Sequence, residues 1–365
     1  MALWRAGERV LSRSGKYHRP RGLQCMQEHC ASCLVRIDGV PNRFACTTPC
    51  ADGMKVERQN AFPNAARDVL RAIDWCFPKT FNHHELLAGV PVAARVMAKV
   101  ARQLSGLGRL PDAPGAPFEP GQDLRVGTLV VGLGRSGRAW LRTSAADGPL
   151  ADPPRDLFVD ATDAVDAAPL AGNERVWPSA RALGVYLEGA APVLAVRRGR
   201  ALWRVRPTKL ILCVGSRAQL LPFAGNDLPG VMTDAAALLL VKHGVRPGQR
   251  ALVAGDAARA ASVAEALRGL NVDVTMLAPA ARLLRAEGGH RLRRAVGVTS
   301  GAEVAWRVDA LVVAGPRAPA FELAEQAGAQ IAFVPGRGFA VRTDARGQTS
   351  VPWLWAFGSC AESGC

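Results

Sequence analysis

Four cysteines near the start of this 365-residue chain have a spacing that could hold an iron–sulfur cluster. Cys25, Cys30, Cys33 and Cys46 follow the order C-x4-C-x2-C-x12-C. The first three, with a distal cysteine, match the plant-type [2Fe-2S] pattern, in which four thiolates converge on two irons. Zinc is the alternative, but zinc sites usually take two separated C-x2-C pairs, and only one is present. We therefore predict a [2Fe-2S] cluster on these four cysteines and expect Cys50 to be a bystander thiol.

A second pattern is the glycine fingerprint Gly132-Leu133-Gly134-Arg135-Ser136-Gly137, which follows a strand-like run at 128–131. In such a turn, the first glycine permits the tight bend, the second lets a pyrophosphate approach, and the third lets helix pack on strand. Asp160 follows at about the distance typical of an acidic ribose ligand. The pattern predicts a dinucleotide site on Gly132, Gly134, Gly137 and Asp160. A glycine-rich turn without a ligand is the alternative.

A weaker copy of this fingerprint keeps its first glycine as Gly255, but Ala257 and Ala260 stand at the second and third positions. A methyl group at the second position crowds a pyrophosphate, and Asp256 adds negative charge where a phosphate would lie. The next strand-like run ends at Ala278, with no carboxylate for a ribose. We predict that this second unit does not bind NAD(P).

The sequence predicts that these residues are positioned by an N-terminal cysteine-containing module and by an α/β body that follows it. The Asp38-Gly39 pair predicts a hairpin turn, and valine spacing predicts a helix over 92–107. Strands and helices alternate beyond 122, which favours a parallel sheet. The predicted domains are a ferredoxin-like [2Fe-2S] module (1–60), a helical connector and linker (61–122), a first FAD-type Rossmann part (123–245), an inserted degenerate NAD(P)-like Rossmann domain (246–345) and a return to the FAD domain (346–365).

Composition narrows the class of protein. Net charge is +15, but only 6 of the 46 basic residues are lysines and the arginines are scattered, so we expect no nucleic-acid partner. No apolar run is long enough to span a bilayer and the start lacks a signal-type core, so we expect a cytoplasmic protein. For four histidines we expect polar surface roles: His18, His29, His83 and His84.

Several strings resemble the α subunits of sarcosine oxidase-type enzymes, whose relatives include hydrogen cyanide synthase, opine oxidase and proline or hydroxyproline dehydrogenases. These strings are Lys16–Gly22, the cysteine loop, Val35–Asn42, GNDLPGVM at Gly225–Met232, Val313–Leu323 and Pro352–Gly358. The resemblance implies a ferredoxin-like module fused to a two-dinucleotide-binding body. It also implies FAD at the first fingerprint, with Gly215 and Gly358 at strand ends that return to the flavin.

By the same resemblance, the chain would be the electron-transfer subunit of a multi-subunit FAD/[2Fe-2S] oxidoreductase acting on amines or amino acids. An amine- or amino-acid-oxidising flavoprotein subunit would be its partner in a hetero-oligomer. Two alternatives are a non-catalytic scaffold that keeps only the cluster, and an NAD(P)H-dependent ferredoxin-type reductase. No catalytic residue is assigned, because no triad or carboxylate pair stands out.

The chain departs from this family at three kinds of position. The family module begins with a hairpin upstream of the position of Met1. Met26 and Glu28 stand where relatives often carry glycine, and Ser359 stands where relatives place an acidic residue near the flavin. We therefore expect FAD, if bound, to be held weakly.

Overall fold

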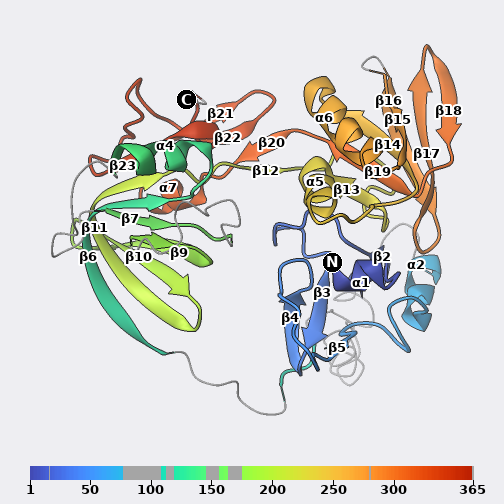
Figure 1. Cartoon of the computed structure of the whole chain (residues 1–365), viewed down its shortest axis with the longest axis horizontal. Coiled ribbons are helices and arrows are strands. Elements are labelled where there is room, and N and C mark those ends of the chain that lie inside the picture. The colour runs from blue at the N-terminus through green and yellow to red at the C-terminus, as the bar shows by residue number, and fades with distance from the viewer. Residues whose placement is uncertain are drawn as a thin grey trace, which may run out of the picture. The chain divides into compact units, whose positions relative to one another are not determined.

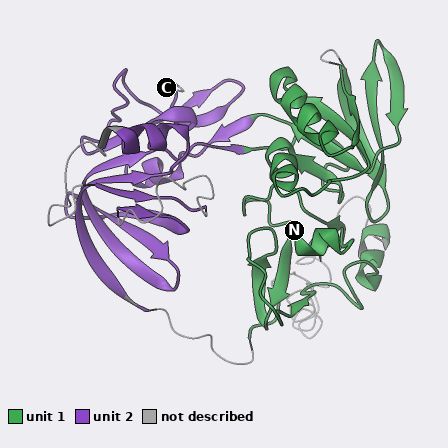
Figure 2. Ribbon diagram, viewed as in Figure 1, with its two compact units in different colours: residues 1–115, 218–316 green, residues 116–217, 317–365 purple. Residues whose placement is uncertain are grey.

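The computed structural model describes residues 1–15, 17–76, 108–111, 119–144, 156–162, 175–278 and 281–363 (Figure 1). The chain divides into two compact units: residues 1–115 with 218–316, and residues 116–217 with 317–365 (Figure 2). We call them unit 1 and unit 2. Each unit combines two separate segments of sequence, because the chain leaves unit 2 after residue 217 and returns to it at residue 317.

Unit 2 is built on a seven-stranded sheet in the order β8-β7-β6-β11-β10-β9, with β23 also paired to β11. Its strands β6, β7, β8, β11 and β23 run parallel, whereas β9, β10 and β11 form an antiparallel meander. The strands are β6 (Glu119–Val131), β7 (Asp156–Val159), β8 (Val176–Trp177), β9 (Ala180–Glu188), β10 (Ala191–Arg198), β11 (Ala201–Leu212) and β23 (Leu354–Ala356).

The central strands of this sheet are buried on both faces, which is why they read as continuous apolar runs. Leu129, Leu210 and Ile211 are fully buried. β6 begins at Glu119, within the predicted linker, because β11 is long enough to pair with it from Ala201 onward. The remaining elements are α4 (Arg135–Ser144), β12 (Ser216–Ala218), β20 (Arg317–Pro319), α7 (Glu322–Gln326), β21 (Ile331–Val334), β22 (Gly338–Val341) and the 3-10 turn η3 (Gly358–Cys360).

Unit 1 contains a second parallel sheet in the order β13-β19-β14-β15. Its elements are β13 (Val231–Thr233), α5 (Asp234–Lys242), β14 (Arg250–Gly255), α6 (Ala257–Arg268), β15 (Asp273–Met276) and β19 (Ala310–Ala314), with an antiparallel sheet of β16 (Arg282–Gly288), β17 (Leu292–Thr299) and β18 (Ala302–Trp306).

The insertion therefore differs from the predicted range of 246–345. Its compact segment is 218–316, because β13 pairs with β19 and joins the inserted sheet. The hairpin of β21 and β22 lies in the segment that belongs to unit 2.

The N-terminal part of unit 1 is a small module of short strands and turns. It comprises α1 (Ala2–Arg5), β1 (Ser12–Arg13), β2 (Pro20–Arg21), β3 (Leu34–Ile37), β4 (Val40–Phe44), β5 (Val56–Glu57), η1 (Val69–Arg71) and α2 (Ala72–Cys76). The predicted turn is confirmed: Asp38 and Gly39 both have positive φ, 48° and 77°, between β3 and β4. The predicted helix over 92–107 lies outside the described residues.

This module and the inserted sheet share one hydrophobic core. Trp4, Leu23 and Met26 of the module are buried in the same cluster as Met232 and Leu240 of the insertion. The family-specific string at 225–232 contributes to this junction. An added side chain at Gly22 would lie 2.6 Å from Arg9 O and 3.0 Å from Pro229 Cβ. Module and insertion therefore share one core within unit 1.

Candidate functional site

The four predicted cluster ligands come together around the β3–β4 hairpin. Cys25, Cys30 and Cys33 lie on the loop that follows β2 and leads into β3. The hairpin brings the fourth cysteine back, because Ala45 N donates to Cys33 O at 3.0 Å and Cys46 is the next residue. The loop therefore positions three of the ligands and the returning strand positions the fourth, as the spacing predicts.

The thiols are arranged as two pairs. A hydrogen bond from the Cys30 thiol lowers the pKa of Cys25 to about 6 and raises the pKa of Cys30. A corresponding bond lowers the pKa of Cys46 and raises that of Cys33. Among the described residues, no group of three or more His, Cys, Asp or Glu side chains has the geometry of a metal-ion site. Two pairs suit a binuclear cluster, in which each iron takes two protein ligands.

The backbone of the loop is wrapped so that amides face sulfur. Gln27 N donates to Cys25 Sγ at 3.3 Å, and amides of His29 and Cys30 also bond to that sulfur. Such bonds favour the thiolate and help to set a cluster's potential. The donor set and its surroundings therefore fit a [2Fe-2S] cluster.

Three non-glycine residues of this loop adopt the left-handed conformation: Met26, Glu28 and Ala31, with φ of 53°, 61° and 54°. Such φ values have a cost for every residue except glycine. Here the conformation is stabilised by other contacts. Met26 is buried in the shared core, and the Glu28 carboxylate accepts a hydrogen bond from Thr47 Oγ1.

A chain of hydrogen bonds ties the cluster loop to the inserted domain. Ser12 Oγ donates to Ser32 O at 2.9 Å, and Ser32 Oγ donates to Gln24 Oε1 at 3.0 Å. The Gln24 side chain in turn donates through Nε2 to Asn226 O at 3.0 Å, and the main-chain carbonyl of Gln24 accepts from Thr233 N at 2.9 Å. The sequence pattern gave no sign of this link, because it joins residues about 200 positions apart.

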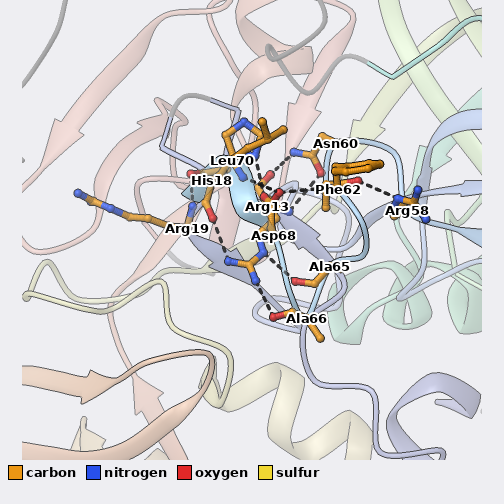
Figure 3. A network of polar contacts seen from close by, with 12 residues as sticks. Arg13, His18, Arg19, Arg58, Asn60, Phe62, Ala65, Ala66, Asp68 and Leu70 are labelled. Carbon is orange, nitrogen blue, oxygen red and sulfur yellow. Dashed lines mark hydrogen bonds and ion pairs between the residues drawn. The ribbon is translucent and has the colours of Figure 1, made fainter. Parts of the chain in front are cut away.

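The prediction that His18 has a polar surface role is wrong. His18 is fully buried, and its Nδ1 lies 2.8 Å from Asp68 Oδ2, which is equally buried (Figure 3). The other Asp68 oxygen accepts from the amides of Phe62 and Leu70. Arg13 surrounds the pair by donating to the His18, Ala65 and Ala66 carbonyls. His29 is exposed, as expected, and His83 and His84 lie outside the described residues.

The first glycine fingerprint lies in unit 2, and its three glycines have different steric surroundings. Gly132 has φ of 97° and faces the Cys213 carbonyl, so a Cβ there would lie under 3.0 Å from Cys213 O. A Cβ at Gly137 would lie equally close to Gly132 O, which places helix α4 tightly on β6. A Cβ at Gly134 would meet nothing within 4 Å. The turn therefore leaves open the place where a pyrophosphate would lie, and the residues fit a dinucleotide.

Asp160 lies beside this turn at the end of β7. Its Oδ2 accepts from Leu133 N at 2.6 Å, and its Oδ1 accepts from the amide and hydroxyl of Thr162. The carboxylate therefore fixes the glycine turn directly. Its role toward a ribose stays a prediction.

Gly215 and Gly358 also have positive φ, 73° and 76°, and both lie at the carboxyl edge of the unit 2 sheet. A Cβ on Gly358 would lie 2.5 Å from Ser136 Oγ, so this residue borders the start of helix α4. Ser359 is exposed and its carbonyl accepts from Arg337. The family resemblance predicts an acidic residue here, whereas Ser359 has a short neutral side chain.

The second fingerprint, in unit 1, is occupied by its own side chains. Asp256 caps helix α6 by accepting from Arg259 N at 3.0 Å, and this backbone bond lowers the pKa of Asp256. Arg259 Nη1 lies 3.1 Å from the buried Asp234. A carboxylate at a helix N-terminus opposes a phosphate there. That this turn does not bind NAD(P) stays a prediction.

Comparisons with known proteins support this architecture. Residues 1–61 match the family model for the 2Fe-2S iron-sulfur cluster binding domain. The chain is 27% identical to the sarcosine oxidase subunit alpha of Rhizobium meliloti (strain 1021), covering 88% of this chain and 38% of that protein. It is 32% identical over 182 residues to the biphenyl dioxygenase system ferredoxin–NAD(+) reductase component of Paraburkholderia xenovorans (strain LB400), covering 42% of this chain and 43% of that protein.

Among solved structures, the L-proline dehydrogenase from P. horikoshii matches 99% of this chain and 64% of its own, with a TM-score of 0.70 and 19% identity, which shows the fold. The chain spans less than half the length of both curated relatives. No helix among the described residues has the length and apolar character that a membrane crossing requires.

The comparisons therefore show a [2Fe-2S] cluster binding domain joined to an α/β body with the fold of the L-proline dehydrogenase structure. This confirms the predicted fold class. The three likenesses fit the family suggested by the sequence strings, the sarcosine oxidase-type α subunits.

Proposed function

We propose that this chain is the electron-transfer subunit of a multi-subunit FAD and [2Fe-2S] oxidoreductase that acts on amines or amino acids. The observation that carries the proposal is the convergence of four thiols in two pairs, on a domain fused to a dinucleotide fold. The likeness to a sarcosine oxidase subunit alpha supports the substrate class.

The cofactors would supply the redox chemistry, since FAD exchanges one or two electrons and a [2Fe-2S] cluster one at a time. The chain's own residues would hold and tune them. The Gln27 amide stabilises negative charge on Cys25 sulfur. Gly134 leaves the approach to the α4 N-terminus open, and Asp160 holds the turn in shape. Because Ser359 brings no carboxylate, FAD would be held weakly.

A partner flavoprotein subunit would oxidise the C–N bond of the substrate and pass electrons to this chain. The sequence itself offers no substrate-oxidising constellation. The name of the matched relative, a subunit alpha, supports such an assembly.

The test is the visible spectrum of the anaerobically purified chain, with iron, sulfide and flavin quantified. We expect near-equal iron and acid-labile sulfide and a rhombic EPR signal after reduction. Cys46→Ser should lose most of the iron, because the thiol paired with Cys33 is removed. Cys50→Ser is the matched control, since Cys50 is exposed and outside the two pairs. Stoichiometric zinc without iron would contradict the proposal.

Flavin binding distinguishes the scaffold alternative from the proposed electron-transfer function. A chain that keeps the cluster but shows no flavin after mild purification, and no binding of added FAD, would favour the scaffold. The reductase alternative draws on the likeness to a ferredoxin–NAD(+) reductase component. The capped helix at Asp256 opposes it.

A further inference from the structure

Two adjoining hollows lie at the amino edge of the unit 1 parallel sheet. The first, of about 410 Å³, is bordered by Gly230, Gln249 and Asp309, which directly precede β13, β14 and β19. These strands are parallel, so their starts share one edge. Gly255, the fingerprint turn, ends β14 at the opposite edge. The hollows are therefore separate from the place where a nucleotide would bind.

Arginines dominate the lining. Arg9, Arg246 and Arg291 line the first hollow. The second, of about 720 Å³, shares Arg291 and Asp309 with the first and adds Arg250, Arg293, Arg294 and Arg307. Volumes of this size are typical of small-molecule sites.

The carboxylates at these hollows are already engaged. Asp309 accepts from the amides of Gln249 and Arg250 at 2.8 to 3.1 Å. Glu287 is bonded to Arg285 and Arg294. Within the described part of the chain, neither Arg246 nor Arg291 has a carboxylate within ion-pair distance. Asp309 still offsets part of the charge on Arg9. With seven arginines and two carboxylates, the lining of the two hollows carries a net positive charge.

Part of this charge is held in place by packing. Arg9 donates to Trp4 O at 2.6 Å, and its guanidinium lies 4.1 Å from the centre of the Trp4 ring. Trp4 is buried and donates through Nε1 to Arg246 O at 2.9 Å. One tryptophan therefore fixes both Arg9 and the backbone of Arg246. Preorganised guanidinium groups lose less entropy when they bind an anion.

Two glycines that border the first hollow, Gly230 and Gly248, pack closely against Asp309. A Cβ on Gly230 would lie 2.9 Å from Asp309 O, and one on Gly248 would also be too close to Asp309. Burial lowers the pKa of Arg9 and the nearby Arg291 lowers it further, whereas Asp309 and Glu8 act in the opposite direction. A bound anion would relieve this repulsion.

From this geometry we propose that the arginine-lined hollows bind a small polyanion that carries two or more phosphate or carboxylate groups. Guanidinium groups pair with both kinds of anion through two parallel hydrogen bonds. The concave shape favours a small ligand over a flat protein surface. This site is independent of the proposed electron-transfer function, because it uses none of the predicted cofactor ligands.

The test is calorimetric titration of the cluster-loaded full chain with inorganic pyrophosphate and, separately, with citrate, at fixed ionic strength. We expect saturable binding of at least one probe. The double variant Arg246→Gln with Arg291→Gln should weaken it by about tenfold for each guanidinium removed. The matched control is Arg197→Gln with Arg282→Gln. It removes the same charge from exposed arginines outside both hollows.

Pyrophosphate binding alone identifies a phosphate site, and citrate binding alone a carboxylate site; either supports the proposal if only the hollow variant loses it. Equal weakening of probe binding in both variants would show that binding depends only on net charge, and would overturn the proposal. Binding of polyglutamate without either small probe would also overturn it, in favour of an acidic protein surface. Iron content and thermal unfolding of each variant verify that the fold is intact.

Discussion

Alanine at Gly134 and alanine at Gly137 should have opposite effects on stability, although the two glycines are three residues apart. At Gly137 the new Cβ would lie under 3.0 Å from Gly132 O, a backbone atom that cannot rotate away. We expect overpacking of about 3 kcal/mol or more. This is offset by about 1 kcal/mol of helix propensity, because the residue lies in α4. The net loss should be about 2 kcal/mol.

At Gly134 the new Cβ meets nothing within 4 Å, and φ lies outside the left-handed region. Removing a glycine then stabilises the fold by about 0.4 to 1 kcal/mol through the unfolded chain. The same methyl group would occupy the place of a pyrophosphate, so FAD affinity should fall by about tenfold or more. Thermal unfolding of the flavin-free chain and fluorescence titration with FAD measure the two effects separately. Unchanged FAD affinity in Gly134→Ala would refute the assignment of this turn.

Three further predictions concern unit 1. Gln24→Leu removes the side-chain bonds to Ser32 and Asn226, so the cluster should be lost faster to a chelator, whereas Gln27→Leu, with an exposed side chain, should not change the rate. Asp68→Ala leaves the buried His18 and two amides unpaired and should lower the free energy of unfolding by about 3 kcal/mol in denaturant titrations. NADH and NADPH should show no low-micromolar binding by calorimetry, and such binding by either would revive the reductase hypothesis.

Local signals predicted the parts of the chain whose structure depends on neighbours in sequence. The glycine turn at 132–137 and the hairpin turn at Asp38-Gly39 were identified because their backbone conformations require particular residues. The cysteine loop was identified because thiol spacing reflects the size of the cluster.

Long-range pairing was not visible in the sequence. β13 pairs with β19, about 80 residues later in the sequence, and the compact segment that contains both strands is 218–316. His18 was misassigned for the same kind of reason. A histidine near a basic, glycine-containing stretch looks exposed until its partner, Asp68, is known from a segment 50 residues away.

The degenerate second fingerprint is explained by the structural support that the inserted domain gives to the cluster module. The module's own sheet has three short strands, β4, β3 and β5, too few to bury a core alone. The inserted sheet completes that core through Met232 and Leu240, and Gln24 binds both Asn226 and Thr233. This support does not require glycine at positions 257 and 260 of the nucleotide turn. The intact core and the altered turn are therefore compatible, and the inserted domain's structural role does not depend on NAD(P).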